Sequence, residues 1–278
     1  MTTRVDLGDF TSPVAICGGV VSNLEALTAF AERMASLGIA ADHIIHTGDV
    51  IAYCASPAEC AGFVMARGWP AIKGNVEAQL AAGSDDCGCG FEDGTPCDLV
   101  SGQWYAYANA AITDDQRRWM AALPDHLALT MNNITARIVH GSPERINRYV
   151  FASSTDLEAQ FDIAGADIII AGHSGLPFTR RHGNHLWHNS GSLGLPANDG
   201  TARVWYSIIA PCDKGIKITH YALTYDHHTA AAKMQTAPLP QSYAKTLTTG
   251  LWPALDVLPE EEKSMTGQPL NPPTVIYP

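Results

Sequence analysis

The sequence contains four short polar segments, each directly after an apolar run of strand-like composition. They are TGDV (47–50), GNVE (74–77), HGSP (140–143) and GHSG (172–175). A short apolar run that ends in glycine and polar residues is typical of a buried β-strand. The carboxyl ends of the strands in an open α/β sheet usually carry its functional side chains. The pattern therefore predicts an α/β protein in which four polar turns gather at strand ends.

Each of these segments offers one side chain that is suited to binding a metal ion. Asp49, Asn75, His140 and His173 supply a carboxylate, an amide oxygen and two imidazoles. Such a mixed set suits Mn, Fe or Zn. A single residue of this kind more often caps a helix or makes an ordinary polar contact. The ordered set of four predicts a site for one divalent metal ion, with one or two coordination positions left for water and substrate.

In this order, the four segments resemble those of calcineurin-like metallophosphoesterases of the small bacterial phosphodiesterase type. The resemblance extends from about residue 13 to about residue 223. It includes SNLEAL (22–27), which is similar to the family's first helix, and NSGSLGLP (189–196), which is similar to the turn after its last metal segment. The resemblance implies two packed mixed β-sheets flanked by helices, and a hydrolase of a small phosphorylated compound.

The chain departs from the family pattern mainly at the ligands of one of the two metals. Counted back from SNLEAL, the family's first Asp falls on Gly19 and its first His on Val21. Its last metal-binding His falls on Gly175, and its usual catalytic His falls on Val76. The resemblance therefore implies that every ligand that binds the first metal alone is missing, whereas all four ligands of the second metal are present.

Three functions are open to such a chain. The first, which we favour, is a phosphoesterase-like hydrolase that uses a single divalent metal. The second is a pseudoenzyme or binding protein that keeps the fold. The third is a mononuclear metalloenzyme with non-phosphate chemistry. Retention of one complete ligand set favours a functional metal over an empty scaffold, whereas the fold does not decide between the first and third functions.

Other residues are candidates for supporting roles. Three basic residues flank the metal segments and are suited to an anionic substrate, although solvated charge is the simpler explanation: Lys73, Arg145 and Arg148. Five thiol or imidazole side chains are candidates to replace the missing first-metal ligands, although core packing or surface exposure is the simpler explanation: Cys17, His46, His182, His185 and His188.

Residues 83–97 are rich in glycine and acid and lack periodicity, which predicts an inserted loop near the site. The loop contains Cys87, Cys89 and Cys97, which can bind a metal or form a redox pair. Free thiols are the interpretation we prefer. The chain has seven cysteines in all, and an odd, scattered set predicts reduced thiols or metal ligands rather than a disulfide framework.

Composition limits the partners and the domain organisation. A net charge of −11 argues against nucleic acid and an anionic membrane surface, which leaves a small-molecule substrate. The first dozen residues do not resemble a signal peptide and no apolar run is long enough to span a membrane, so we expect a cytoplasmic protein. We expect a lead at 1–12, one domain at 13–229 and a Pro-rich, largely aperiodic tail at 230–278. Such a tail packs on the domain, exchanges into a homo-oligomer or is partly disordered.

The apolar patterns also predict individual elements. Strands are expected at 13–17, 43–47, 71–73, 167–171, 204–209 and 216–223. Helices are expected at 22–37, 57–67 and from residue 75, the first of them starting at a capping box formed by Ser22 and Glu25. Two hairpins are expected at 127–139 and 178–188, turning at Asn132–Asn133 and Gly183–Asn184.

Overall fold

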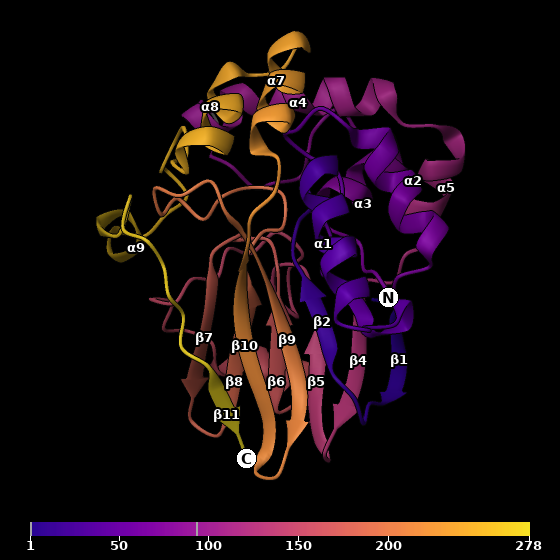
Figure 1. Ribbon diagram of the computed structural model, residues 1–278, viewed down its shortest axis with the longest axis vertical. Helices are drawn as coiled ribbons and strands as arrows, with labels where there is room; N and C mark the ends of the chain where they lie inside the picture. The colour runs from indigo at the N-terminus through magenta and orange to yellow at the C-terminus, as the bar shows by residue number, and fades with distance from the viewer. Residues whose placement is uncertain (1, 93) are drawn as a thin grey trace.

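The computed structural model describes residues 2–92 and 94–278, and its centre is a pair of mixed β-sheets (Figure 1). The six-stranded sheet has the order β1 (Arg4–Asp9), β4 (His126–Met131), β5 (Ile134–Ile138), β6 (Ile168–Ala171), β8 (His185–Ser190), β7 (Pro177–His182). The five-stranded sheet has the order β11 (Val275–Tyr277), β10 (Gly215–Leu223), β9 (Val204–Cys212), β2 (Val14–Cys17), β3 (Ile44–His46). Each sheet combines parallel and antiparallel pairs. The predicted two mixed sheets flanked by helices are confirmed.

The alternation of side chains along each strand explains how the layers pack. Successive residues of a strand point to opposite faces. In β2, Val14 and Ile16 join the cluster between the sheets, whereas Ala15 and Cys17 join the cluster under the helices. Because both faces are covered, the whole strand is apolar and buried. A third cluster lies on the outer face of the six-stranded sheet, where Phe161 packs beside Trp187.

The helices lie mainly at the end of the sheets towards which β2 points (Figure 1). They are α1 (Leu24–Ser36), α2 (Pro57–Arg67), α3 (Asn75–Ala82), α4 (Pro96–Ala111), α5 (Asp114–Ala122), α6 (Glu158–Ala164), α7 (His227–Thr236), α8 (Gln241–Thr249) and α9 (Glu260–Ser264), with a short 3₁₀ helix at Ala41–His43. In the described part of the chain, no helix combines the length and the apolar character that a membrane crossing requires.

Most predicted elements are present, but one strand near the amino terminus was not predicted and the predicted cap of the first helix is wrong. The lead at 1–12, of which residue 1 lies outside the described residues, contains β1, which pairs in parallel with β4. Its residues are largely exposed, as is common on an edge strand, so it has no apolar signal. Helix α1 is capped by Asn23, whose side chain accepts from the Ala26 amide at 3.1 Å. The proposed cap, Ser22, instead accepts from the Ala52 amide at 3.2 Å.

The carboxy-terminal segment is regular, contrary to the aperiodic tail that we predicted from residue 230. Helix α7 begins at His227, before that boundary, and packs against α8 and α1. The last residues form β11, which extends the five-stranded sheet beside β10. Between them the chain passes α9 and runs down the side of the sheets (Figure 1). Its many prolines therefore mark turns between short elements that pack on the domain.

Candidate metal centre

Four side chains from four turns meet at one end of the sheets. Asp49 follows β3, Asn75 opens α3, His140 follows β5 and His173 follows β6. Asp49 and His173 have positive φ angles of 58° and 37°. A left-handed backbone costs a side-chain-bearing residue about 1–2 kcal/mol, and such strain is often found where a functional side chain must be aimed. The fold thus brings the four sequence-predicted ligands together.

The Nε2 atom of His140 is the focus of this group. It lies 3.0 Å from Asn75 Oδ1, 3.1 Å from His173 Nδ1 and 3.2 Å from Asp49 Oδ2. One ligand atom each from Asp49, His140 and His173 lies within 4.8 Å of the others. Two ligands bonded to one ion at about 2.1 Å are about 3.0 Å apart at a right angle and about 3.4 Å apart in a tetrahedron. The observed separations therefore fit ligands that share an ion.

Hydrogen placement strengthens this fit. His140 Nδ1 lies 2.7 Å from the Thr47 carbonyl oxygen, so Nδ1 carries a proton and donates it. In the neutral ring Nε2 then presents a lone pair to the amide oxygen, the carboxylate and the second imidazole. A proton on Nε2 would satisfy one of these acceptors, whereas a cation would satisfy all of them. A carbonyl that fixes the tautomer of a ligating histidine is a common feature of metal sites.

The charges of these residues are strongly coupled. Burial opposes ionisation of Asp49, but the neighbouring His140 outweighs burial and holds the pKa of Asp49 below its usual range. Burial likewise opposes the charged His140 ring, but Asp49 and the Thr47 carbonyl raise the pKa of His140. Burial, with a smaller contribution from His140, lowers the pKa of His173 to about 3. His173 is therefore neutral and available as a lone-pair donor across the physiological range.

Glu77 is a buried carboxylate that the prediction of site residues missed. Its two oxygens accept from the backbone amides of Asp49 at 2.7 Å, Gly74 at 2.9 Å and Ile51 at 3.2 Å. Burial and the charge of Asp49 raise its pKa to about 7. The turn it fastens is tight, because a Cβ on Gly74 would lie 2.0 Å from Asp49 Oδ1. Glu77 therefore positions Asp49 through the backbone. The sequence signal for this role was the position of Glu77 as an acidic residue two places after Asn75.

The positions of the missing first-metal ligands line a pocket beside these four residues. Gly19, Val21 and Gly175 are all on its wall. Val21 has a φ of 45°, which is a genuine outlier for a β-branched residue. A Cβ on Gly19 would lie 3.5 Å from the Cβ of Asp49. The strained backbone at Val21 thus carries a side chain that offers only methyl groups.

The five candidate replacement ligands are placed elsewhere. Cys17 is buried, its pKa is raised by burial, and its thiol donates to the Ile45 carbonyl at 3.6 Å. His46 Nδ1 accepts from the Gly48 amide at 3.0 Å, behind the pocket wall. Both ring nitrogens of His188 are engaged, by hydroxyls on β7 and β9. His182 and His185 stack on the Phe161 ring. Among the described residues, only Asp49, His140 and His173 form a cluster of this kind.

The three candidate basic residues also stay outside the pocket. Lys73 lies 3.6 Å from an Asp125 carboxylate oxygen. Arg148 pairs with Asp156 at 2.7 Å and with Glu144 at 3.8 Å. Arg145 is exposed. Of the residues that the structure describes, the pocket wall includes neither lysine nor arginine.

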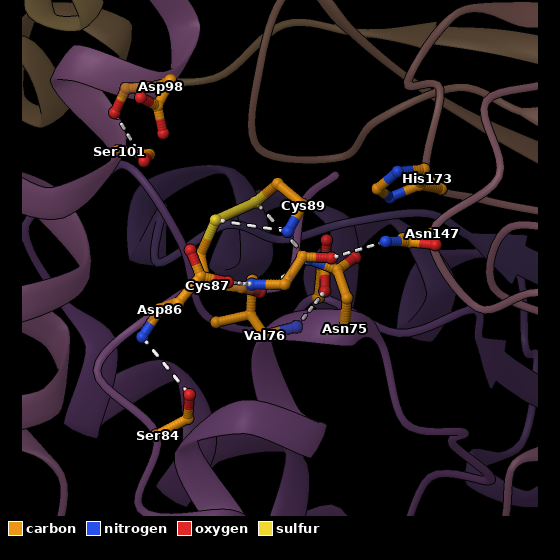
Figure 2. The surroundings of a disulfide bond; sticks show 12 residues. Asn75, Val76, Ser84, Asp86, Cys87, Cys89, Asp98, Ser101, Asn147 and His173 are labelled. Carbon is orange, nitrogen blue, oxygen red and sulfur yellow. Dashed lines mark hydrogen bonds between the residues drawn. A yellow bond between two sulfur atoms is a disulfide. The ribbon is translucent and has the colours of Figure 1, made fainter. Parts of the chain in front are cut away.

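The loop at 83–97 covers the cluster, and its cysteines differ from the predicted free thiols. Cys87 and Cys89 form a disulfide, with their Cα atoms 5.4 Å apart. The Asn75 amide donates to the Cys87 carbonyl at 3.0 Å and to Cys89 Sγ at 3.4 Å, directly beneath the disulfide (Figure 2). These contacts turn Asn75 Oδ1 towards His140. Cys97 is the second residue of α4 and has a free thiol, and residue 93 of the loop lies outside the described residues.

Aromatic side chains complete the pocket, and they also were not predicted. The Tyr149 ring lies 4.2 Å from the His173 ring, and Tyr53 stacks on Tyr243 at 4.6 Å between centroids. Trp252 also lines the pocket, and its indole donates to the Pro196 carbonyl at 2.7 Å. Burial raises the pKa of all three tyrosines, so their hydroxyls keep their protons. No sequence pattern linked these residues, because they come from separate turns and from the tail.

Comparison with known proteins agrees with this architecture. The family model described as the calcineurin-like phosphoesterase superfamily domain matches residues 14–210. An uncharacterized protein of Methanocaldococcus jannaschii is 25% identical over 256 residues, covering 86% of this chain and 98% of its own length. A metallophosphoesterase from Sphaerobacter thermophilus superposes with a TM-score of 0.68 at 21% identity, over 87% of this chain and all of that one. A hypothetical protein from Pyrococcus horikoshii gives 0.72 at 18% identity, over 86% and 99%.

Proposed function

Since the chain belongs to the calcineurin-like phosphoesterase superfamily, we propose that it is a metal-dependent hydrolase of a small phosphorylated compound that works with a single divalent ion. Asp49, Asn75, His140 and His173 would hold the ion. The observation that supports this best is that Asn75 Oδ1, His173 Nδ1 and Asp49 Oδ2 all lie 3.0–3.2 Å from Nε2 of His140. Because a proton on Nε2 could satisfy only one of these three atoms whereas a cation could satisfy all of them, this arrangement favours a bound cation.

When bound, a divalent ion supplies Lewis-acid polarisation of a phosphoryl oxygen and lowers the pKa of water. The protein's part is to fix the ligands and to shield the reaction. Thr47 holds the tautomer of His140, Glu77 holds the Asp49 turn, and the Cys87–Cys89 loop orients Asn75. With one ion in place of two, we expect turnover roughly 10³-fold below that of a dinuclear relative.

Metal content and turnover, measured on the same samples, test the proposal. Protein purified without chelator should contain about one divalent ion per chain and should hydrolyse bis(4-nitrophenyl) phosphate. His173→Ala should lose both properties. His228→Ala is the matched control, because His228 is an exposed histidine on α7. Metal without turnover of any phosphoester would contradict hydrolysis and favour a binding role or non-phosphate chemistry. Absence of metal from the wild type would contradict the ligand assignment.

Restoring the missing ligands tests the single-ion part separately. Gly19→Asp, Val21→His and Gly175→His would together return the side chains that the family carries at these places. The combined variant should bind close to two ions per chain, with faster turnover than the wild type. Its control is the same variant with Asp49→Asn, which lacks the bridging carboxylate. Two ions already present in the wild type would refute the single-ion proposal and leave the hydrolase proposal intact.

A further inference from the structure

The side chain of Asn189 holds the chain on both sides of the ligand His173. Asn189 lies near the end of β8 and is completely buried. Its Nδ2 atom donates to the Gly172 carbonyl at 2.5 Å and to Ser174 Oγ at 2.9 Å. A side-chain amide has two N–H groups, so both of them are engaged by the two neighbours of His173 in the sequence.

The turn that contains His173 needs such a restraint because its backbone is strained. His173 has a φ of 37°, and a side-chain-bearing residue keeps such a conformation only where its surroundings hold it. The Gly172 amide donates to the His140 carbonyl at 2.8 Å, and a Cβ on Gly172 would lie 2.4 Å from Thr47 Oγ1. The Gly172 carbonyl, one residue beyond the end of β6, is the atom that Asn189 bonds. The turn is therefore fixed to the neighbouring ligand segments through its amide and to β8 through its carbonyl.

Further contacts fix the orientation of the Asn189 amide. Its Oδ1 accepts from the Gly191 amide at 3.0 Å, and its main-chain carbonyl accepts from His220 Nε2 at 2.9 Å. A flipped amide would place Oδ1 against the Gly172 carbonyl oxygen and Nδ2 against the Gly191 N–H, and neither contact would be a hydrogen bond. The side chain therefore has one orientation, in which both of its donors point to the turn of His173.

From these contacts, and resting on the proposed metal site, we propose that Asn189 is a positioning residue that holds His173 so that its Nδ1 faces the ion. That atom lies 3.1 Å from Nε2 of His140, as expected for two ligands of one ion. Asn189 is not among the described residues that line the pocket, so it acts through the turn and not by contact with the ion or the substrate. Loss of a group that orients a ligand typically weakens metal binding roughly 10–100-fold.

The substitution Asn189→Asp tests this role with almost no change in side-chain size. It replaces the donor with a carboxylate oxygen, which repels the Gly172 carbonyl. Calorimetric titration of metal-free protein should show Mn²⁺ binding weakened roughly 10–100-fold. The matched control is Asn23→Asp, because Asn23 is also buried and its amide donates to the Gly194 carbonyl at 2.8 Å and to Tyr225 Oη at 3.1 Å. Neither partner is a metal ligand, so this control should leave the Mn²⁺ affinity unchanged.

The visible spectrum of Co²⁺-loaded protein separates positioning from a general loss of stability. An ion that loses His173 takes up water in its place, which changes the d–d bands of Co²⁺. The spectrum of Asn189→Asp at saturating Co²⁺ should therefore differ from that of the wild type, whereas that of Asn23→Asp should not. A purely structural role would lower the stability of both variants and leave both spectra unchanged.

A second variant covers the case in which Asn189→Asp does not fold. Asn189→Ala removes the two donors without adding a charge, and it should change the Mn²⁺ affinity and the Co²⁺ spectrum in the same direction. Wild-type affinity and a wild-type spectrum in either folded variant would overturn the proposal. Wild-type protein that binds no ion would overturn the proposed function itself, so the two failures are distinguishable.

Discussion

Metal binding should displace one proton from His140, which gives the metal affinity a defined dependence on pH. His140 Nδ1 donates to the Thr47 carbonyl at 2.7 Å, so the ion must bind at Nε2. In the metal-free protein, Asp49 and the Thr47 carbonyl outweigh burial and raise the pKa of His140 above its usual 6.5. Below that pKa, Nε2 carries a proton that competes with the ion.

The other ligands set the size of the effect. Burial lowers the pKa of His173 to about 3, and His140 holds that of Asp49 below its usual range against the effect of burial. Neither ligand should therefore be protonated between about pH 5 and the pKa of His140. Competition with a single proton weakens binding about tenfold per pH unit. The logarithm of the dissociation constant should fall with a slope of one as pH rises, and then level off.

Calorimetric titration of metal-free protein with Mn²⁺ measures both quantities. The dissociation constant is followed against pH, and the proton count comes from two buffers of different ionisation enthalpy. Glu77, whose pKa is raised to about 7 by burial and Asp49, can add a fraction of a proton. Glu77→Gln removes this contribution and should release one proton. A dissociation constant that does not change between about pH 5 and 6.5, or no proton release in Glu77→Gln, would refute the reasoning.

Three further results are expected. Burial lowers the pKa of His46 from 6.5 to about 3, so the free energy of unfolding of the metal-free protein should fall as pH falls from 6.5 towards 3, by up to about 5 kcal/mol. Urea unfolding should show a weaker dependence of this free energy on pH for His46→Asn, and the same dependence in both proteins would contradict this. Reduction of the Cys87–Cys89 disulfide should weaken Mn²⁺ binding at least about tenfold by releasing Asn75. In the variant with both cysteines replaced by serine, calorimetry should find the same Mn²⁺ affinity with and without reductant. Asp199→Ala removes the carboxylate that accepts from Arg203 and from the Leu270 amide. The variant should lose about 3 kcal/mol of unfolding free energy, measured with urea, and its tail should become exposed to protease. An unchanged urea midpoint would argue against a role of Asp199 in anchoring the tail.

The sequence predicted the strands that are buried on both faces most securely. The residues of β2 and β6 are uniformly apolar because each strand lies between two packed layers. The hairpin at Asn132–Asn133 was equally clear, and both residues have positive φ. Strand β1 was missed because an exposed edge needs no apolar residues, and the helices and strand of the tail were missed because they are stabilised by contacts with distant parts of the chain.

Prediction of the site shows the same division between local and distant information. Asp49, His140 and His173 were identified because each follows a strand, and the strands themselves bring them together. The position of Tyr149 in the pocket wall depends on a turn whose path is set by tertiary packing, and the residues beside it in the sequence do not indicate a pocket. The Cys87–Cys89 disulfide likewise depends on how the loop folds over Asn75, whereas the odd number of cysteines had favoured free thiols.

The wall formed by the tail has a consequence for the order in which a new molecule is made. The strands that carry the ligands, and those paired beside them, are complete by Leu223, whereas the tail's part of the pocket wall begins at Tyr243, 20 residues later. At about 5–20 residues per second, translation of that interval takes roughly 1–4 s. During it the nascent chain presents its ligands without the aromatic cover that the tail supplies. We therefore expect newly synthesised chains to acquire the ion most readily before the tail closes over them.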